Sequence, residues 1–191
     1  MGYFNSIKYC ICDVFYKIRE CKWKFIGCVA VSLIGFALGI AFFCMSGYGW
    51  WYYNRCEFAS RLPAADFGVF ISFVALTALL YVLYLLCGMT RITHYLSYLV
   101  NIVACIYCGA TVAAVFVYST AWGVLFTVFV AVPDLAVKCF ACFVSVCERS
   151  LCRTFCESAR DLKQLAVVLA VGLLYKIIAL FVILKLLTAL I

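Results

Sequence analysis

The strongest constraint on this chain is its long runs without a charged residue. Residues 25–46, 68–90 and 95–132 contain no charged side chain, and 164–191 contain only Lys176 and Lys185. A helix needs about 20 apolar residues to cross a hydrocarbon core about 30 Å thick. These runs lack the alternation of apolar and polar residues that is typical of barrel strands. With 69% hydrophobic and 12% charged residues, the chain is predicted to be an all-α integral membrane protein.

The apolar runs divide the chain into four parts. Residues 25–137 are expected to form a four-helix transmembrane bundle with spans near 25–46, 68–90, 96–117 and 121–137. Pro133 should kink the fourth span or end its regular part. The segments 1–24 and 138–163 are predicted to be two interfacial amphipathic helices. The last segment, 164–191, is either a fifth span or a re-entrant hairpin, so we expect four to five transmembrane helices.

The distribution of basic residues predicts the orientation. Residues 1–24 carry five basic and two acidic side chains, and further basic residues lie in 91–94 and 138–163. Short basic segments favour the cytoplasmic side of a membrane. The amino terminus is therefore expected in the cytoplasm and the 47–67 loop on the opposite side. Its Trp50-Trp51-Tyr52-Tyr53 cluster is typical of the membrane interface. An endomembrane, a plasma membrane or a viral envelope would fit equally.

Cysteines are concentrated near the basic segments, which makes lipid attachment a candidate modification. Met1-Gly2-Tyr3-Phe4-Asn5-Ser6 fits the signal for N-myristoylation at Gly2. Thiols beside a basic membrane surface are candidates for S-palmitoylation, which would supply the second anchor that stable attachment needs. The candidate thiols are Cys10, Cys12, Cys21, Cys139, Cys142, Cys147, Cys152 and Cys156.

Four of these cysteines also resemble a metal site. Cys139-x2-Cys142-x4-Cys147-x4-Cys152 resembles the retroviral-type zinc knuckle, which would imply tetrahedral zinc. The usual third ligand, a histidine, and the turn glycines are absent. In a helix the four thiols would spread over about 20 Å of axis. We therefore expect no metal, no cofactor and no nucleic-acid partner.

Cys105-Ile106-Tyr107-Cys108 is a CxxC motif within the third span. A CxxC in a membrane helix resembles the redox pair of the vitamin K epoxide reductase family, which would imply thiol–disulfide or quinone chemistry. That family also uses a shuttle pair of loop cysteines, and the 47–67 loop contains only Cys56. Two thiols packed inside the bundle are the simpler interpretation.

Two further sets of residues carry structural predictions. Cys44 and Cys56 would lie on the non-cytoplasmic side, where a disulfide between them is allowed. Gly35 and Gly39 in the first span and Gly109 and Ala113 in the third form small-xxx-small faces. Such faces let helix backbones approach closely in lipid, either within one bundle or between copies.

These observations favour a non-enzymatic protein. No Ser/His/Asp set, paired carboxylates or phosphate loop is present. The leading hypothesis is a multi-pass protein that acts by assembly with the bilayer and with other membrane subunits, as a structural or membrane-shaping component. The alternatives are an oxidoreductase using Cys105 and Cys108, or a channel or transporter subunit with Lys176 in its path. We expect Lys176 to snorkel to the headgroups.

Overall fold

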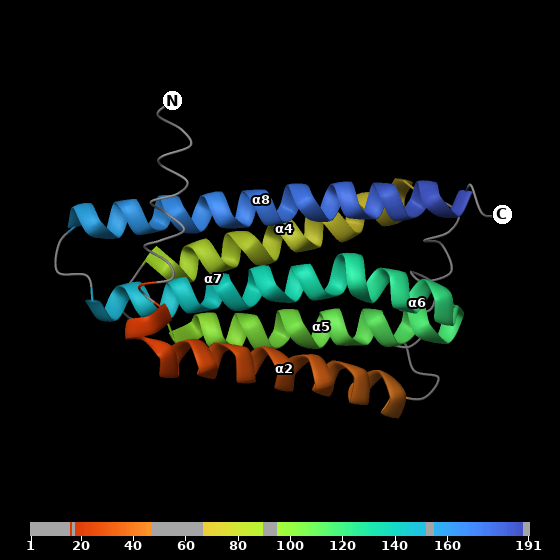
Figure 1. The fold of residues 1–191 in the computed structure, drawn as a ribbon, viewed down its shortest axis with the longest axis horizontal. Helices are drawn as coiled ribbons and strands as arrows, with labels where there is room; N and C mark the ends of the chain where they lie inside the picture. The colour runs from red at the N-terminus through yellow and green to blue at the C-terminus, as the bar shows by residue number, and fades with distance from the viewer. Residues whose placement is uncertain (1–15, 17, 47–66, 90–94, 152–154, 189–191) are drawn as a thin grey trace.

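The computed structural model describes residues 16, 18–46, 67–89, 95–151 and 155–188, and these residues form helices without any strand (Figure 1). The helices are α2 (Lys22–Met45), α4 (Phe67–Met89), α5 (Leu96–Tyr118), α6 (Thr120–Phe126), the π-helical turn η2 (Thr127–Ala131), α7 (Val132–Leu151) and α8 (Phe155–Thr188). The predicted spans at 25–46, 68–90 and 96–117 agree closely with α2, α4 and α5.

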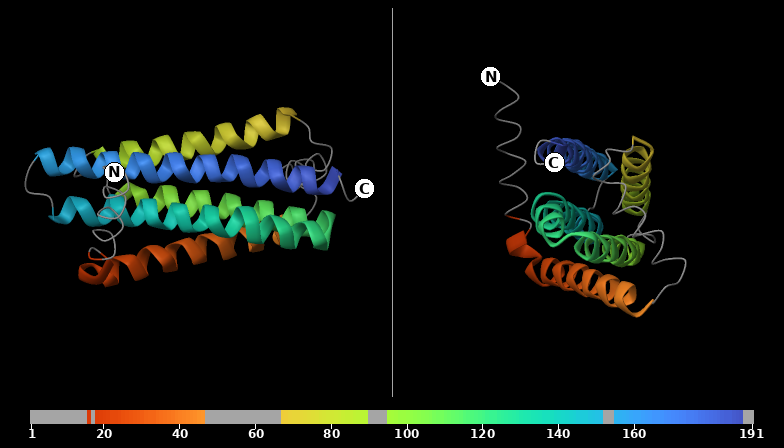
Figure 2. Two further views of the ribbon diagram at one scale, coloured as in Figure 1. Left: turned by 45° about the horizontal axis from the view of Figure 1, so that its top comes forward. Right: turned by 90° about the vertical axis from the view of Figure 1, so that its right-hand side faces the viewer.

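Consecutive helices run antiparallel, and α6, η2 and α7 follow one another as a single rod (Figure 1). Seen from the end, α5 and α7 form the middle layer, with α2 on one side and α4 and α8 on the other (Figure 2). The starts of α2, α5 and α8 lie at the same end of the bundle as the ends of α4 and α7 (Figure 1). The start of the first described helix and the boundary between α7 and α8 therefore lie at the same end of the bundle.

Within the described ranges, four helical segments are long and apolar enough to cross a membrane. They are Lys22–Met45, Leu96–Val117, Thr120–Val146 and Leu165–Val182. In α4 the described apolar stretch, Val74–Cys87, is shorter. The outer faces of the helices expose large apolar side chains such as Leu33, Phe42 and Val171. Continuous apolar faces of this kind are compatible with lipid rather than with water.

The helix that contains Pro133 differs from the prediction. It does not end near residue 137, and 138–151 do not begin a separate interfacial helix, because α7 continues through this point. Ala141, Cys142 and Phe143 are fully enclosed by the bundle. The π-helical turn Thr127–Ala131 precedes Pro133. Its hydrogen bonds follow the wider π pattern, and the helix continues through the proline. The proposed boundary at 137/138 was therefore wrong.

The carboxy-terminal segment is one helix. α8 contains 34 residues without a break, so the hairpin alternative for 164–191 is wrong over the described part of that segment. Its inner face carries Leu165, Leu169, Lys176 and Leu180, all buried. These positions recur at four- and seven-residue intervals, which is the spacing of one helix face.

Candidate functional site

The π-helical turn and Pro133 in the α6–α7 rod lie next to the site. In a regular α-helix the carbonyl of Phe129 would accept a hydrogen bond from residue 133, but proline has no N–H. The hydroxyl of Tyr175 on α8 donates to this carbonyl at 3.1 Å. The π-helical turn also contains one more residue than a regular turn. The residues after it therefore lie on a different side of the helix than they would in a regular α-helix. Asp134, the next residue after Pro133, lies in the interior of the bundle.

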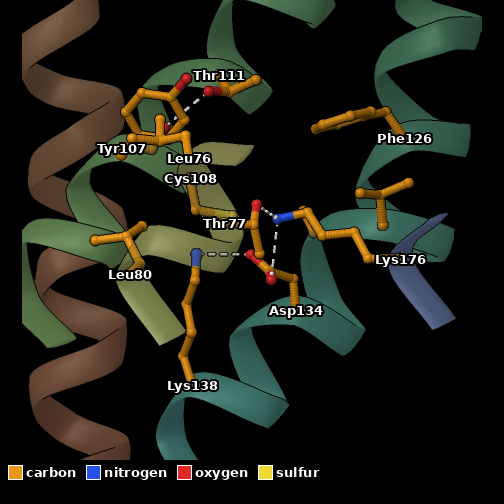
Figure 3. Close-up of a pocket in the computed structure, with 12 residues that line it drawn as sticks. Leu76, Thr77, Leu80, Tyr107, Cys108, Thr111, Phe126, Asp134, Lys138 and Lys176 are labelled. Atoms are coloured by element: carbon orange, nitrogen blue, oxygen red, sulfur yellow. Dashed lines mark hydrogen bonds and ion pairs between the residues drawn. The ribbon is translucent and has the colours of Figure 1, made fainter. Parts of the chain in front are cut away.

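Asp134 is the centre of a charged cluster that also contains Lys138 and Lys176 (Figure 3). Nζ of Lys138 lies 2.6 Å from Oδ2 of Asp134, and Nζ of Lys176 lies 3.0 Å from Oδ1. The two lysines reach the carboxylate from opposite sides, one from α7 itself and one from α8 (Figure 3). Each carboxylate oxygen therefore has its own ammonium partner.

The remaining polar partners come from α4 and α5. The hydroxyl of Tyr81 donates to Oδ1 of Asp134 at 3.2 Å. Lys176 donates to Oγ1 of Thr77 at 2.9 Å, and Lys138 donates to the carbonyl oxygen of Ala104 at 3.2 Å. Three helices thus meet at the carboxylate, and α5 joins them through Lys138. We call Thr77, Tyr81, Asp134, Lys138 and Lys176 the charged cluster.

Burial makes this cluster unusual. Asp134, Lys138 and Lys176 are only 5%, 2% and 4% exposed. Each lies near the middle of its apolar segment, far from both ends of the bundle. A charged side chain at the centre of a membrane helix costs about 2.5–3.5 kcal/mol on insertion scales, so such groups are rare and pair with one another. Two ammonium groups and one carboxylate leave a net charge of +1 in the cluster.

A small cavity borders the cluster. It is lined by residues of the five helices α4 to α8 and of the π-helical turn, among them Tyr107, Cys108, Thr111, Phe126 and the charged side chains (Figure 3). Its volume is about 10 Å³, which is about the space that the centre of one water molecule requires. The site therefore has room for a single water-sized particle beside the two ammonium groups.

A second, uncharged network joins α2, α4 and α5 nearer the basic end. The hydroxyl of Tyr84 donates to Oδ1 of Asn101 at 2.8 Å, and Nδ2 of Asn101 donates to Oγ of Ser32 at 2.8 Å. Ser32 in turn donates to the carbonyl of Cys28. Asn101 is fully buried, and both ends of its amide are satisfied. It connects three helices without adding a charge.

The CxxC cysteines face different neighbours. Cys105 lies against α2, where its Cβ is among the atoms nearest to Gly35, and its thiol donates weakly to Asn101. Cys108 lines the cavity beside Lys138. Both thiols are buried and free. The structure thus places them in two separate environments, and the predicted redox role stays untested.

Among the lipidation candidates, the described cysteines divide into two groups. Cys21 is partly exposed just before α2, whereas Cys139 and Cys142 are buried between helices. The thiol of Cys142 donates to the carbonyl oxygen of Ser97 on α5 at 3.7 Å. An acyl chain on either α7 thiol would have to displace this packing. Within the described side chains no group of metal-ligating residues is arranged to hold an ion.

Several candidates lie outside what the structure describes. Gly2, Cys10, Cys12, Cys56 and Cys152 belong to the segments left out, and the side chains of Cys147 and Cys156 are not described either. The disulfide between Cys44 and Cys56 therefore stays a prediction, with Cys44 exposed near the end of α2.

The small-residue faces of α2 and α5 meet inside the bundle. A Cβ on Gly39 would overlap the carbonyl oxygen of Ile106, and one on Gly109 would overlap that of Phe36. A Cβ on Gly35 would lie 3.0 Å from the carbonyl oxygen of Ile102. Ala113 continues the same buried face of α5. The two backbones thus touch along about two helical turns.

Sequence reasoning missed most of the charged cluster. Lys176 was expected to snorkel, which is wrong, because it is buried and bonded to Asp134. Lys138 was assigned to an interfacial segment, and Asp134 was not singled out. Their spacing contained a usable signal, because an acid and a base four residues apart on a helix neutralise one another. In an apolar context that pattern predicts a paired, buried charge.

No known protein family, no curated protein and no solved structure matches this chain.

Proposed function

We propose that this protein is a non-enzymatic membrane protein that moves a small ion across the bilayer through the charged cluster. The observation that carries the proposal is the position of Asp134, Lys138 and Lys176 together at the middle of the apolar bundle. Ionisable groups inside membrane helices commonly mark ion pathways, because their cost must be offset by a function or by pairing. Here two ammonium groups share one carboxylate.

The way in which α4 is attached supports transport rather than a static role. This helix meets the charged cluster through the hydroxyl groups of Thr77 and Tyr81. The partners of these hydroxyl groups are the ammonium of Lys176 and the carboxylate of Asp134, so a change in the charge of the cluster changes what holds α4 in place. Transport would use this dependence to open the cavity to one side at a time.

The test is ion flux into liposomes that contain the purified protein. Replacing the charge by Lys176→Gln is expected to reduce the flux at least tenfold, because the substitution removes the ammonium that faces both Asp134 and Thr77. Lys163→Gln is the matched control, because Lys163 is exposed at the start of α8 and lies outside the cluster. Thermal unfolding in detergent checks that both variants are folded. Equal flux for wild type and Lys176→Gln would overturn the proposal.

The proposed orientation places the amino terminus in the cytoplasm. The support is that the starts of α2, α5 and α8 share one end of the bundle, and Arg19, Lys22, Lys24 and Lys163 lie at or near helix starts there. Basic residues favour the cytoplasmic face. Labelling a single cysteine at residue 19 in intact and in permeabilised membranes tests this orientation; labelling in intact cells would contradict it.

A second candidate function is assembly with other membrane subunits. The observation that favours it is the length of α8, whose 34 residues span about 51 Å at 1.5 Å per residue. The hydrocarbon core is only about 30 Å thick, so α8 extends past it. Its first turn contains Cys156, a candidate thiol for lipid attachment at the end of the helix. Intact mass before and after hydroxylamine, together with chemical cross-linking, tests this candidate.

A further inference from the structure

We infer that Lys176 is the proton-exchanging group of the charged cluster, so that the ion handled by this site is H⁺. The inference rests on the proposed function and names its substrate. It is carried by the arrangement of one carboxylate, two lysines and an adjacent hydroxyl around a water-sized cavity.

The charge balance requires that the cluster can become neutral. With both lysines protonated and Asp134 ionised, the enclosed net charge is +1, and isolated charges in a low-dielectric interior are strongly disfavoured. Loss of one proton leaves a carboxylate and one ammonium, which neutralise each other. The same cluster therefore has two states that differ by a single proton.

Hydrogen bonding selects Lys176 as the group that loses this proton. Its nitrogen faces Oγ1 of Thr77, and a hydroxyl can either accept a hydrogen bond from an ammonium or donate one to a neutral amine. Lys138 instead faces the carbonyl oxygen of Ala104, which can only accept. Lys138 also makes the shorter contact with Asp134, 2.6 Å against 3.0 Å. Lys138 therefore keeps its proton as the permanent partner of the carboxylate.

The titratable groups that face Lys176 are compatible with this exchange. They are Tyr81 on α4, Tyr107 and Cys108 on α5, and Asp134 and Lys138 on α7. Tyr81 donates to Oδ1 of Asp134, which holds the carboxylate in its ionised form during the change. The carboxylate thus accepts hydrogen bonds in both states of the cluster.

The exchange step is simple. A water in the cavity accepts a proton from the ammonium of Lys176, the N–H electron pair stays on nitrogen, and the hydronium ion leaves through the cavity. The hydroxyl of Thr77 then turns and donates its hydrogen to the new lone pair. No heavy atom of the cluster has to move, so the chain can pass between both states rapidly.

The experiment is nitrogen-15 NMR of lysine-labelled protein in liposomes, in which ammonium and amine nitrogens are distinguished directly. One lysine signal is expected to change reversibly between the two forms across the physiological pH range, and to vanish in Lys176→Gln. Lys163, which is exposed and lies outside the cluster, supplies the reference signal, and its assignment is checked with Lys163→Gln. A Lys176 signal that stays in one form throughout that range would overturn the inference.

The hydroxyl of Thr77 has its own test. Thr77→Val removes the group that can donate to a neutral amine, and the pH-dependent change of the Lys176 signal is expected to be lost. Thr111→Val is the matched control, because Thr111 lines the same cavity but donates to the carbonyl of Tyr107 in its own helix. An unchanged response in Thr77→Val would overturn the role of this hydroxyl and with it the choice of Lys176 over Lys138.

The NMR result and the flux result are independent of each other. A responsive Lys176 in a protein that moves no ion would leave this inference standing and overturn the proposed function. Ion flux through a protein whose Lys176 keeps the same protonation state would overturn this inference and leave the proposed function standing.

Discussion

The interface between α2 and α5 and the interface of α4 with its neighbours hold helices together in opposite ways. At the first, glycines bring two backbones into direct contact, with Gly39 against Ile106 and Gly109 against Phe36. At the second, hydroxyl groups reach across to polar partners, through Thr77 and Tyr81 at the charged cluster and through Tyr84 at Asn101.

The difference shows which part of the molecule can change shape. Lipid tails are as apolar as the helices, so helix pairs depend on close packing and on hydrogen bonds. Close backbone packing has one fitting arrangement, whereas a hydroxyl can exchange one partner for another. We therefore expect the α2–α5 pair to be the fixed part of the bundle and α4 to be the helix that changes its position more easily.

The largest expected effect comes from removing the carboxylate at the centre of the polar interface. Asp134→Asn leaves two buried ammonium groups facing each other without a counter-charge. Breaking a buried ion pair in this way costs about 3–5 kcal/mol, and we expect a loss of this size in the free energy of unfolding. Reversible unfolding in detergent measures it.

A matched triple variant sharpens this prediction. Replacing Asp134, Lys138 and Lys176 together by leucine removes the desolvation cost along with the pairing, so stability is expected to equal or exceed that of wild type. A triple variant as unstable as Asp134→Asn would show that the polar interface contributes packing rather than charge pairing.

The next effect belongs to the glycine interface. Gly39→Ala places a Cβ against the carbonyl of Ile106, and overpacking of this kind costs about 1–3 kcal/mol. Gly27→Ala is the control, because nothing lies within 4 Å of its Cβ position and alanine favours helix by up to about 1 kcal/mol. Unfolding of both variants is the measurement. Equal behaviour would contradict the close contact between α2 and α5.

The smallest effect is expected at the uncharged network. Tyr84→Phe removes the hydroxyl that donates to Asn101 and keeps the ring that packs in the core. An interhelical hydrogen bond in a membrane bundle averages about 0.6 kcal/mol, so the loss in stability should be of this order. Amide hydrogen exchange along α4 is expected to increase more than that along α2. The opposite pattern would contradict the division into a fixed and an adjustable part.

The helix positions were largely predictable because they follow from local composition. Uncharged runs determine where α2, α4 and α5 begin and end, within a few residues. The α6–α7 rod was not predictable in the same way, since Pro133 suggests an end and only the π-helical turn before it lets the helix continue. In the charged cluster only the pair Asp134 and Lys138 follows from local spacing. The contact of Lys176 with Thr77 joins residues far apart in the chain, and no local pattern encodes it.

The neighbouring positions of Tyr175 and Lys176 link two contacts that α8 makes with the α6–α7 rod. Tyr175 caps the carbonyl that Pro133 leaves without an amide, and Lys176 binds Asp134 just beyond the proline. Rotation of α8 about its own axis would withdraw both side chains in the same movement. The π-helical turn and the buried carboxylate are thus held by the same stretch of α8, so that neither contact can be lost alone when this helix turns.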